Sequence, residues 1–124
     1  MPKTVVLLYR EEDGSVPLRD WLDELEPKAQ AKCVACLRRL EDMGHELRRP
    51  EADFLRDKIY ELRTGHGRIN LRMLYFFHGR GFVVVSHGFT KEDKVVSDRE
   101  IDLAIERKAR FEQAPQKHTF RGER

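Results

Sequence analysis

Apolar residues in the first third of the chain recur with the spacing of helices. Four of them fall at positions i, i+3, i+4 and i+7 shortly after Pro17, namely Leu18, Trp21, Leu22 and Leu25. This spacing puts them on one face of a short helix that starts near Ser15 or Val16 and ends at Pro27. A second helix is predicted from Pro27 to Gly44. Glycine often follows the last residue of a helix. Its core face consists of Ala29, Cys33, Cys36, Leu37 and Leu40. The two segments predict a helical hairpin.

β-branched and alternating apolar residues predict four strands. The first covers residues 3–9 and precedes the helical hairpin. Three more follow it, at residues 59–63, 68–77 and 82–89, and the turns between them each contain two glycines. Short glycine-containing connections between consecutive strands are typical of an antiparallel meander. The valine-rich strand at 82–89 is expected at the centre of the sheet.

A third helix is predicted after the strands. Ser97 and Glu100 have the spacing of a capping box, and apolar residues continue with helical spacing to about Phe111. The predicted order is β-α-α-β-β-β-α, an α+β domain with a helical hairpin packed on a small, mainly antiparallel sheet. Residues 1–112 are expected to form this single domain. Residues 113–124 contain Pro, Gly and scattered charges and are expected to form a flexible tail.

Composition fits one such domain and excludes several classes of protein. The chain has 124 residues, of which 40% are hydrophobic and 37% charged, enough for one modest core. No apolar run approaches the roughly 20 residues of a membrane helix. Unpaired cysteines in a core make a cytoplasmic, reducing compartment the default expectation. Cys33 and Cys36 have C-x-x-C spacing, but they lie on a predicted helix and lack the second cysteine pair of a zinc site. They are therefore interpreted as small core residues. No nucleotide-binding loop or serine-hydrolase motif is present.

Positive charge is concentrated in the strands after the hairpin. Residues 54–94 carry a net charge of +4, whereas residues 1–53 carry −3.

Successive strand residues point to opposite faces, so Arg68, Asn70 and Arg72 share one face. The opposite face is apolar and is expected to meet the helices; it consists of Ile69, Leu71, Met73, Tyr75 and Phe77. If the registers match, Arg63 joins the arginines in a cationic patch on an open sheet face. Arginine can hold a phosphate through two hydrogen bonds, so the patch favours RNA binding. The alternative is a solvated face on which Glu61 neutralises Arg63.

Three further candidates lie at the end of the last strand: His87, Lys91 and Lys94. Alternation places His87 on the same face as Val83 and Val85. A buried, hydrogen-bonded histidine and a general acid or base at a cleft are both compatible with this position. The histidines His66, His78 and His87 are not expected to form a metal site, because two of them lie in turns at opposite ends of one strand.

Four short motifs resemble the phage-derived RelE/HigB-like toxins of type II toxin–antitoxin systems. They are YELR at 60–63, R-x-x-x-R-x-L-Y-F at 68–76, a valine-rich strand ending H-x-F-x-K at 83–91, and E-I-x-x-A at 100–104. The match spans residues 55–111, and the β-α-α order before it agrees with the layout of that family.

The resemblance implies a ribosome-dependent messenger-RNA endonuclease that a cognate antitoxin neutralises. In such enzymes, which use no metal or other cofactor, the ribose 2′-OH attacks the adjacent phosphate, and cationic side chains stabilise the transition state. The implied catalytic residues are Arg68, Arg72, His87 and Lys91. The implied RNA-binding residues are Lys58, Arg63, Asn70 and Lys94. The implied partners are the antitoxin, the ribosome and its message.

The sequence departs from that family near the end of the last strand. Members often carry consecutive lysines there, followed by Thr-Pro, whereas this chain has Glu92 and Asp93 between Lys91 and Lys94, with Ser97 as the helix cap. These acids weaken the positive potential. Two alternatives to an active endonuclease therefore stay open: a non-catalytic RNA- or protein-binding module, and an inactive toxin relative.

Overall fold

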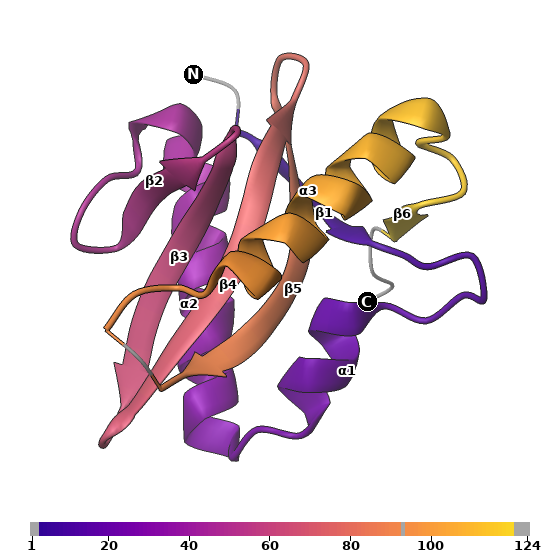
Figure 1. The fold of residues 1–124 in the computed structure, drawn as a ribbon. Helices are drawn as coiled ribbons and strands as arrows, with labels where there is room; N and C mark the ends of the chain where they lie inside the picture. Colours follow the sequence, from indigo (N-terminus) through magenta and orange to yellow (C-terminus); the bar gives the residue numbers. More distant parts are fainter. Residues whose placement is uncertain (1–2, 93, 121–124) are drawn as a thin grey trace.

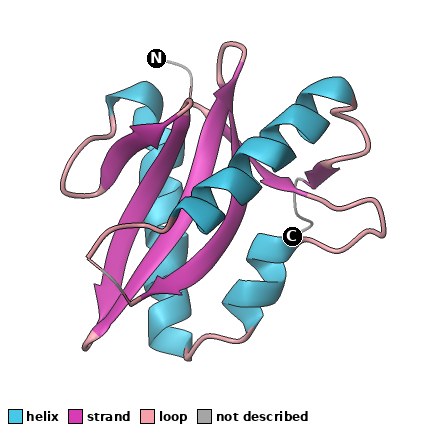
Figure 2. Cartoon of the chain, viewed as in Figure 1, coloured by secondary structure: helices cyan, strands magenta, loops and turns pink. Residues whose placement is uncertain are grey.

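A computed structural model describes residues 3–92 and 94–120 of the chain. It has an α+β fold, as the sequence predicts, in which helices cover both faces of one sheet (Figures 1 and 2). The elements in chain order are β1 (Val5–Tyr9), α1 (Pro17–Asp23), α2 (Pro27–Met43), the short 3-10 helix η1 (Gly44–Glu46), β2 (Ala52–Arg56), β3 (Ile59–His66), β4 (Ile69–His78), β5 (Phe82–Lys91), α3 (Asp98–Gln113) and β6 (Thr119–Phe120).

Six strands of the described ranges form one mixed, mostly antiparallel sheet in the order β2-β3-β4-β5-β1-β6. Strands β2 to β5 form an antiparallel meander, and β1 lies parallel to β5 on its other side. The valine-rich β5 is therefore internal, and Val83, Val84 and Val85 are fully buried. Its predicted central position is confirmed.

Each face of the sheet has its own hydrophobic core. The helical hairpin α1–α2 packs on one face, and α3 crosses the other face diagonally (Figure 1). The hairpin-side core includes Leu18, Ala29, Cys33, Leu40, Leu71, Met73, Tyr75, Val83 and Val85. The α3-side core includes Leu7, Tyr9, Ile59, Leu74, Phe76, Val84, Ile101, Ala104 and Phe111. The α3 side of the sheet is thus half covered, which corrects the expectation of an open sheet face.

Local sequence signals set the helix ends. Pro17 occupies the first turn of α1 after Val16, where its missing N–H costs no helical hydrogen bond. Gly44 follows α2 with a φ of +52°, a conformation that glycine adopts without a side-chain clash. Ser97 caps α3 and accepts a hydrogen bond from the Glu100 N–H. All three predicted boundaries are confirmed.

Two strands were not expected from the sequence. β2 lies between the predicted second helix and the strand predicted at 59–63, and it pairs with β3 through a turn in which Asp57 and Lys58 have positive φ angles. β6 lies within the segment expected to be a flexible tail. It pairs with β1, and the preceding His118 is buried and hydrogen-bonds to the Arg10 carbonyl at 2.8 Å. Residues up to 120 therefore belong to the packed fold, and residues 121–124 lie outside the described residues.

The cysteines confirm their interpretation as core residues. Cys33 is buried in the hairpin-side core, and burial raises the pKa of its thiol to about 12. Cys36 is partly buried beside it, and both thiols are free. None of the helices in the described ranges combines the length and apolarity that a membrane crossing needs.

Gly88 is expected to be intolerant of a side chain. It sits in β5 on the hairpin side, where an added Cβ would overlap the Trp21 ring. We expect Gly88→Ala to lower the free energy of unfolding by about 1–3 kcal/mol, as overpacking does in other cores. Urea unfolding followed by the fluorescence of Trp21, the only tryptophan in the sequence, measures the change.

A double-mutant cycle checks the cause. In a Trp21→Ala background, followed by circular dichroism, the added methyl has room and its cost should shrink. An equal cost in both backgrounds would contradict the steric explanation.

Candidate nucleic-acid interface

The register of β3, β4 and β5 places nine residues of the α3 side in three rows. Directly paired residues share a face of the sheet. The rows are Glu61–Leu74–His87, Arg63–Arg72–Phe89 and Gly65–Asn70–Lys91. The first row lies against α3, because Leu74 packs in the α3-side core and His87 contacts the helix. We call the other two rows the open rows, since exposure increases along them to the exposed Asn70.

The register confirms that Arg63, Asn70 and Arg72 share a face. Arg63 and Arg72 stand directly opposite each other, and about a third of the Arg63 side chain (34%) is exposed. Arg68 is not on this strand surface; it lies in the exposed turn between β3 and β4, beside the third row.

Arg72 corrects the expectation of a fully open cationic patch. Its side chain is only 7% exposed, and its Nε lies 3.3 Å from Oε1 of the equally buried Glu61. The guanidinium also donates to the Leu71 carbonyl at 2.9 Å. Burial lowers the pKa of Arg72, while the charge of Glu61 acts in the opposite direction. A central strand beside α3 has little access to water, so an arginine there needs a carboxylate partner.

Glu61 therefore lies within ion-pair distance of two arginines, Arg72 and Arg63. Its other oxygen, Oε2, lies 3.8 Å from the Arg63 Nε. One carboxylate between two guanidinium groups leaves the cluster with a net charge of +1. The excess charge is accessible through Arg63, the more exposed of the two. The alternative in which Glu61 neutralises Arg63 is thus only half correct, since Glu61 lies closer to Arg72.

His87 lies on the opposite face from the one that simple alternation predicts. Ser86 is an extra residue in β5, because Leu74 pairs with His87 while the next residue, Tyr75, pairs with Val85. Such a β-bulge shifts the alternation by one residue. His87 consequently faces α3 rather than the hairpin side, where Val83 and Val85 lie.

His87 is buried and uses both ring nitrogens. Nδ1 lies 2.7 Å from the Ser86 hydroxyl, and Nε2 lies 2.9 Å from Oε1 of Glu100. Burial lowers the pKa of His87, although the hydrogen bond to Glu100 acts against this. Of the two positions that the sequence allowed, the buried and hydrogen-bonded one is observed.

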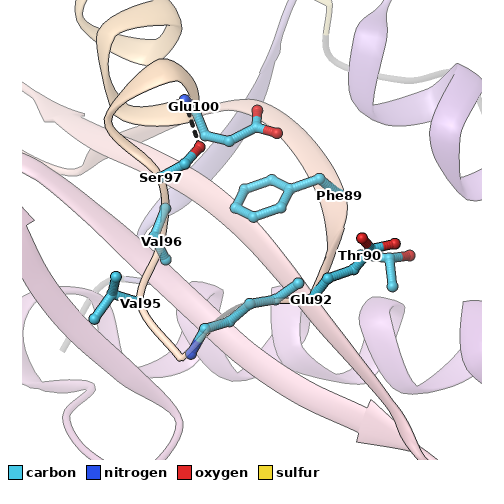
Figure 3. Close-up of a pocket in the computed structure, with 8 residues that line it drawn as sticks. Phe89, Thr90, Glu92, Val95, Val96, Ser97 and Glu100 are labelled. Carbon is cyan, nitrogen blue, oxygen red and sulfur yellow. Dashed lines mark hydrogen bonds between the residues drawn. The ribbon is translucent and has the colours of Figure 1, made fainter.

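A small pocket of about 140 Å³ opens where β5 leaves the sheet and α3 begins (Figure 3). Lys91 lines it, and Asn70 stands opposite Lys91 in the third row. Lys94 is exposed in the connecting loop. Asp93, which is expected to weaken the positive potential together with Glu92, lies outside the described residues. The full lining is Phe89, Thr90, Lys91, Glu92, Val95, Val96, Ser97 and Glu100.

Some predicted residues do not join this region. Lys58 lies in the turn before β3, at the far end of that strand from Arg68; eight residues of strand span roughly 26 Å. His66 lies 3.3 Å from Glu26, and His78 packs edge-on against Phe111. Within residues 3–92 and 94–120, no group of three or more His, Cys, Asp or Glu side chains is placed to hold a metal ion.

Comparison with protein families places the whole of this region in a known group. Residues 20–109, well over half of the chain and including all three rows, match the family described as phage derived protein Gp49-like (DUF891). The chain belongs to the Gp49-like family. This family is part of the RelE/ParE toxin superfamily, so the resemblance found in the sequence is confirmed at that level. No curated protein matches the chain.

The sequence patterns do not single out one residue of this region. Glu100 was interpreted only as part of a helix cap, yet its side chain contacts His87 and lines the pocket. Its place in the first turn of α3 could have indicated this, because that turn must face the sheet for Ile101 and Ala104 to be buried.

Arg72 and Arg63 should differ sharply in their effect on stability. Arg72→Ala leaves the Glu61 carboxylate buried with only a distant partner, so we expect a loss of about 3 kcal/mol or more in the free energy of unfolding. Arg63→Ala removes a partly exposed side chain and should cost about 1 kcal/mol or less. Urea unfolding measures both. Equally small losses would show that Arg72 is as accessible as the sequence alone suggested.

Proposed function

We propose that this Gp49-like protein is the toxin of a toxin–antitoxin pair and a ribosome-dependent messenger-RNA endonuclease. The observation that supports this best is the pair of open rows beyond the start of α3. They combine a partly exposed arginine, Arg63, with Asn70 and Lys91, and Arg68 lies beside them in the turn. A strip of cationic and amide side chains on a sheet suits an RNA backbone.

Arg63 is the residue best placed to bind the reacting phosphate. Its guanidinium is partly exposed, and its Nε lies 3.8 Å from Oε2 of Glu61. A fixed guanidinium can donate two hydrogen bonds to phosphate oxygens, and these strengthen as negative charge grows in the transition state. Arg72, by contrast, supports this arrangement from a buried position.

Phe89 offers a surface for a base. It stands next to Arg72 in the second row, is only partly buried, and lines the pocket. Stacking on an aromatic ring holds a nucleotide whatever its sequence. A base on Phe89 would place its phosphate near Lys91, two residues further along β5 on the same face.

The ribosome is the partner that we propose to orient the RNA. The exposed side chains supply charge, but the described part of the open rows presents no histidine to act as an acid or base. Holding the 2′-OH in line with the scissile bond is worth several kcal/mol of barrier, and a ribosome-bound message can be held in this way. The cognate antitoxin would block the toxin by covering the same surface in the cytoplasm.

The burial of Arg72 and His87 favours a second candidate, a binding module without catalysis. Two of the four side chains expected to be catalytic are inaccessible. Such a module would still bind RNA in a salt-sensitive manner, with log K falling by about 0.7 per phosphate contact for each decade of salt. It would leave the message intact.

A translation extract separates the two functions. The purified wild-type protein should cut messages that are being translated, and Arg63→Ala should slow the cutting by about 10²–10³-fold, as the loss of one transition-state donor does elsewhere. Arg63→Lys keeps the charge without the planar fork and should recover only part of the rate.

Arg80→Ala is the matched control. Arg80 is exposed in the turn between β4 and β5, at the other end of the sheet, and its loss changes the net charge equally. It should cut at the wild-type rate. Intact message at every dose of wild-type protein would contradict the endonuclease, and equal defects in both variants would point to net charge alone.

A further inference from the structure

The side chain of Glu100 is not used as its sequence pattern predicts. In a capping box, the Glu at this position bonds back to the N–H of the cap residue. Here the Ser97 hydroxyl accepts from the Glu100 N–H at 3.4 Å, but the carboxylate is turned to His87, with Oε1 2.9 Å from Nε2. Figure 3 shows the Glu100 carboxylate pointing away from Ser97 and lying above the Phe89 ring.

The carboxylate of Glu100 determines which ring nitrogen of His87 must donate. An ionised carboxylate can only accept, so Nε2 carries the hydrogen and donates it to Glu100. In the neutral imidazole Nδ1 accepts from the Ser86 hydroxyl, 2.7 Å away. Burial lowers the pKa of His87 and so favours the neutral imidazole. Both nitrogens are engaged, and the side chain is only 8% exposed. It can orient Glu100, but it has no free nitrogen for a substrate.

The bulge at Ser86, which provides one end of this hydrogen-bond chain, is held by a contact from α3. Arg107 of α3 donates to the Ser86 carbonyl at 3.5 Å and to Oε2 of Glu11 at 2.8 Å. Both ends of the hydrogen-bond chain are therefore attached to the same helix, through Glu100 and through Arg107. The position of the carboxylate is fixed by the fold rather than by solvent.

Glu100 is accessible where His87 is not. Its side chain is 30% exposed and lines the pocket together with Phe89 and Lys91. Oε2 makes no hydrogen bond within residues 3–92 and 94–120, so one oxygen is oriented and the other is available. The carboxylate is held through one oxygen, and its other oxygen is available in a pocket that Lys91 also lines. Such a carboxylate can accept a proton from a hydroxyl group.

We propose that Glu100 is the general base of the cleavage reaction and that His87 is its positioning residue. This rests on the proposed endonuclease function. Oε2 of Glu100 takes the proton of the 2′-OH as the O2′–P bond forms. The P–O5′ bond breaks, and the Lys91 ammonium group gives a proton to the leaving O5′. The products are a 2′,3′-cyclic phosphate and a 5′-OH, and solvent restores both side chains.

Single-turnover cleavage of ribosome-bound message by Glu100→Gln tests the assignment. Glutamine has the same shape and still accepts from His87, but it is far too weak a base. We expect cleavage to slow by about 10²–10⁴-fold, with unchanged ribosome binding. The control is Glu106→Gln, the same change on the exposed side of α3, which should cut at the wild-type rate.

A message with a bridging 5′ sulfur separates the two proton transfers. A thiolate leaves without protonation, so this substrate should remove most of the defect of Lys91→Ala and none of the defect of Glu100→Gln. Relief of the Glu100→Gln defect would overturn its role as the base.

The role of His87 has its own readout. His87→Leu removes the donor to Glu100, so we expect it to slow cleavage and to add nothing further in the Glu100→Gln background. His87→Gln supplies an N–H again and should restore part of the rate. Independent, multiplying defects would overturn the positioning role.

The outcomes also separate this inference from the function on which it rests. If wild-type protein cuts and Glu100→Gln cuts equally fast, Glu100 is not the base and the endonuclease stands. If wild-type protein does not cut ribosome-bound message, both fall.

Discussion

The β-bulge at Ser86 determines how this fold presents its polar residues. Without the extra residue, His87 and Phe89 would point into the core beneath α1 and α2, where Val83 and Val85 lie. With it, both turn to the α3 side and join the rows of β3 and β4. The bulge also places Gly88 under Trp21, where no larger residue fits. One unpaired residue thus places the side chains at the end of β5 on the same face as the arginines of β3 and β4.

The position of α3 then decides which part of that face is available. The helix covers Leu74 and Phe76, and its first turn is attached to edge strand β2 by Arg56, which contacts Asp98 at 3.1 Å and Asp102 at 2.8 Å. Beyond this turn the sheet continues without a helix above it. Buried charges lie at the boundary and are paired there, as Arg72 is with Glu61, whereas Arg63 and Lys91 lie further out with more access to solvent.

The sequence predicts the fold better than the site, for a physical reason. Helix ends and strand alternation depend on neighbouring residues, so Pro17, Gly44 and Ser97 mark their boundaries correctly. The bulge, the burial of Arg72 and the contact of Glu100 with His87 depend on pairing between distant strands and on where α3 lies. Nothing in the run VVVSHGF shows that Ser86 is unpaired. β2 was missed because it is short, contains the charged residues Asp53 and Arg56, and follows Pro50. These features are typical of an exposed edge strand as well as of a loop.

The chemistry proposed for the open rows is tested most directly by the RNA ends that the wild-type protein leaves on ribosome-bound message. Attack by the 2′-OH, with a base at Glu100, predicts upstream fragments that end in a 2′,3′-cyclic phosphate and downstream fragments that begin with a 5′-OH. Fragments with a 3′-OH and a 5′-phosphate would show that water is the nucleophile. That result would contradict the central role given to Glu100, Arg63 and Lys91.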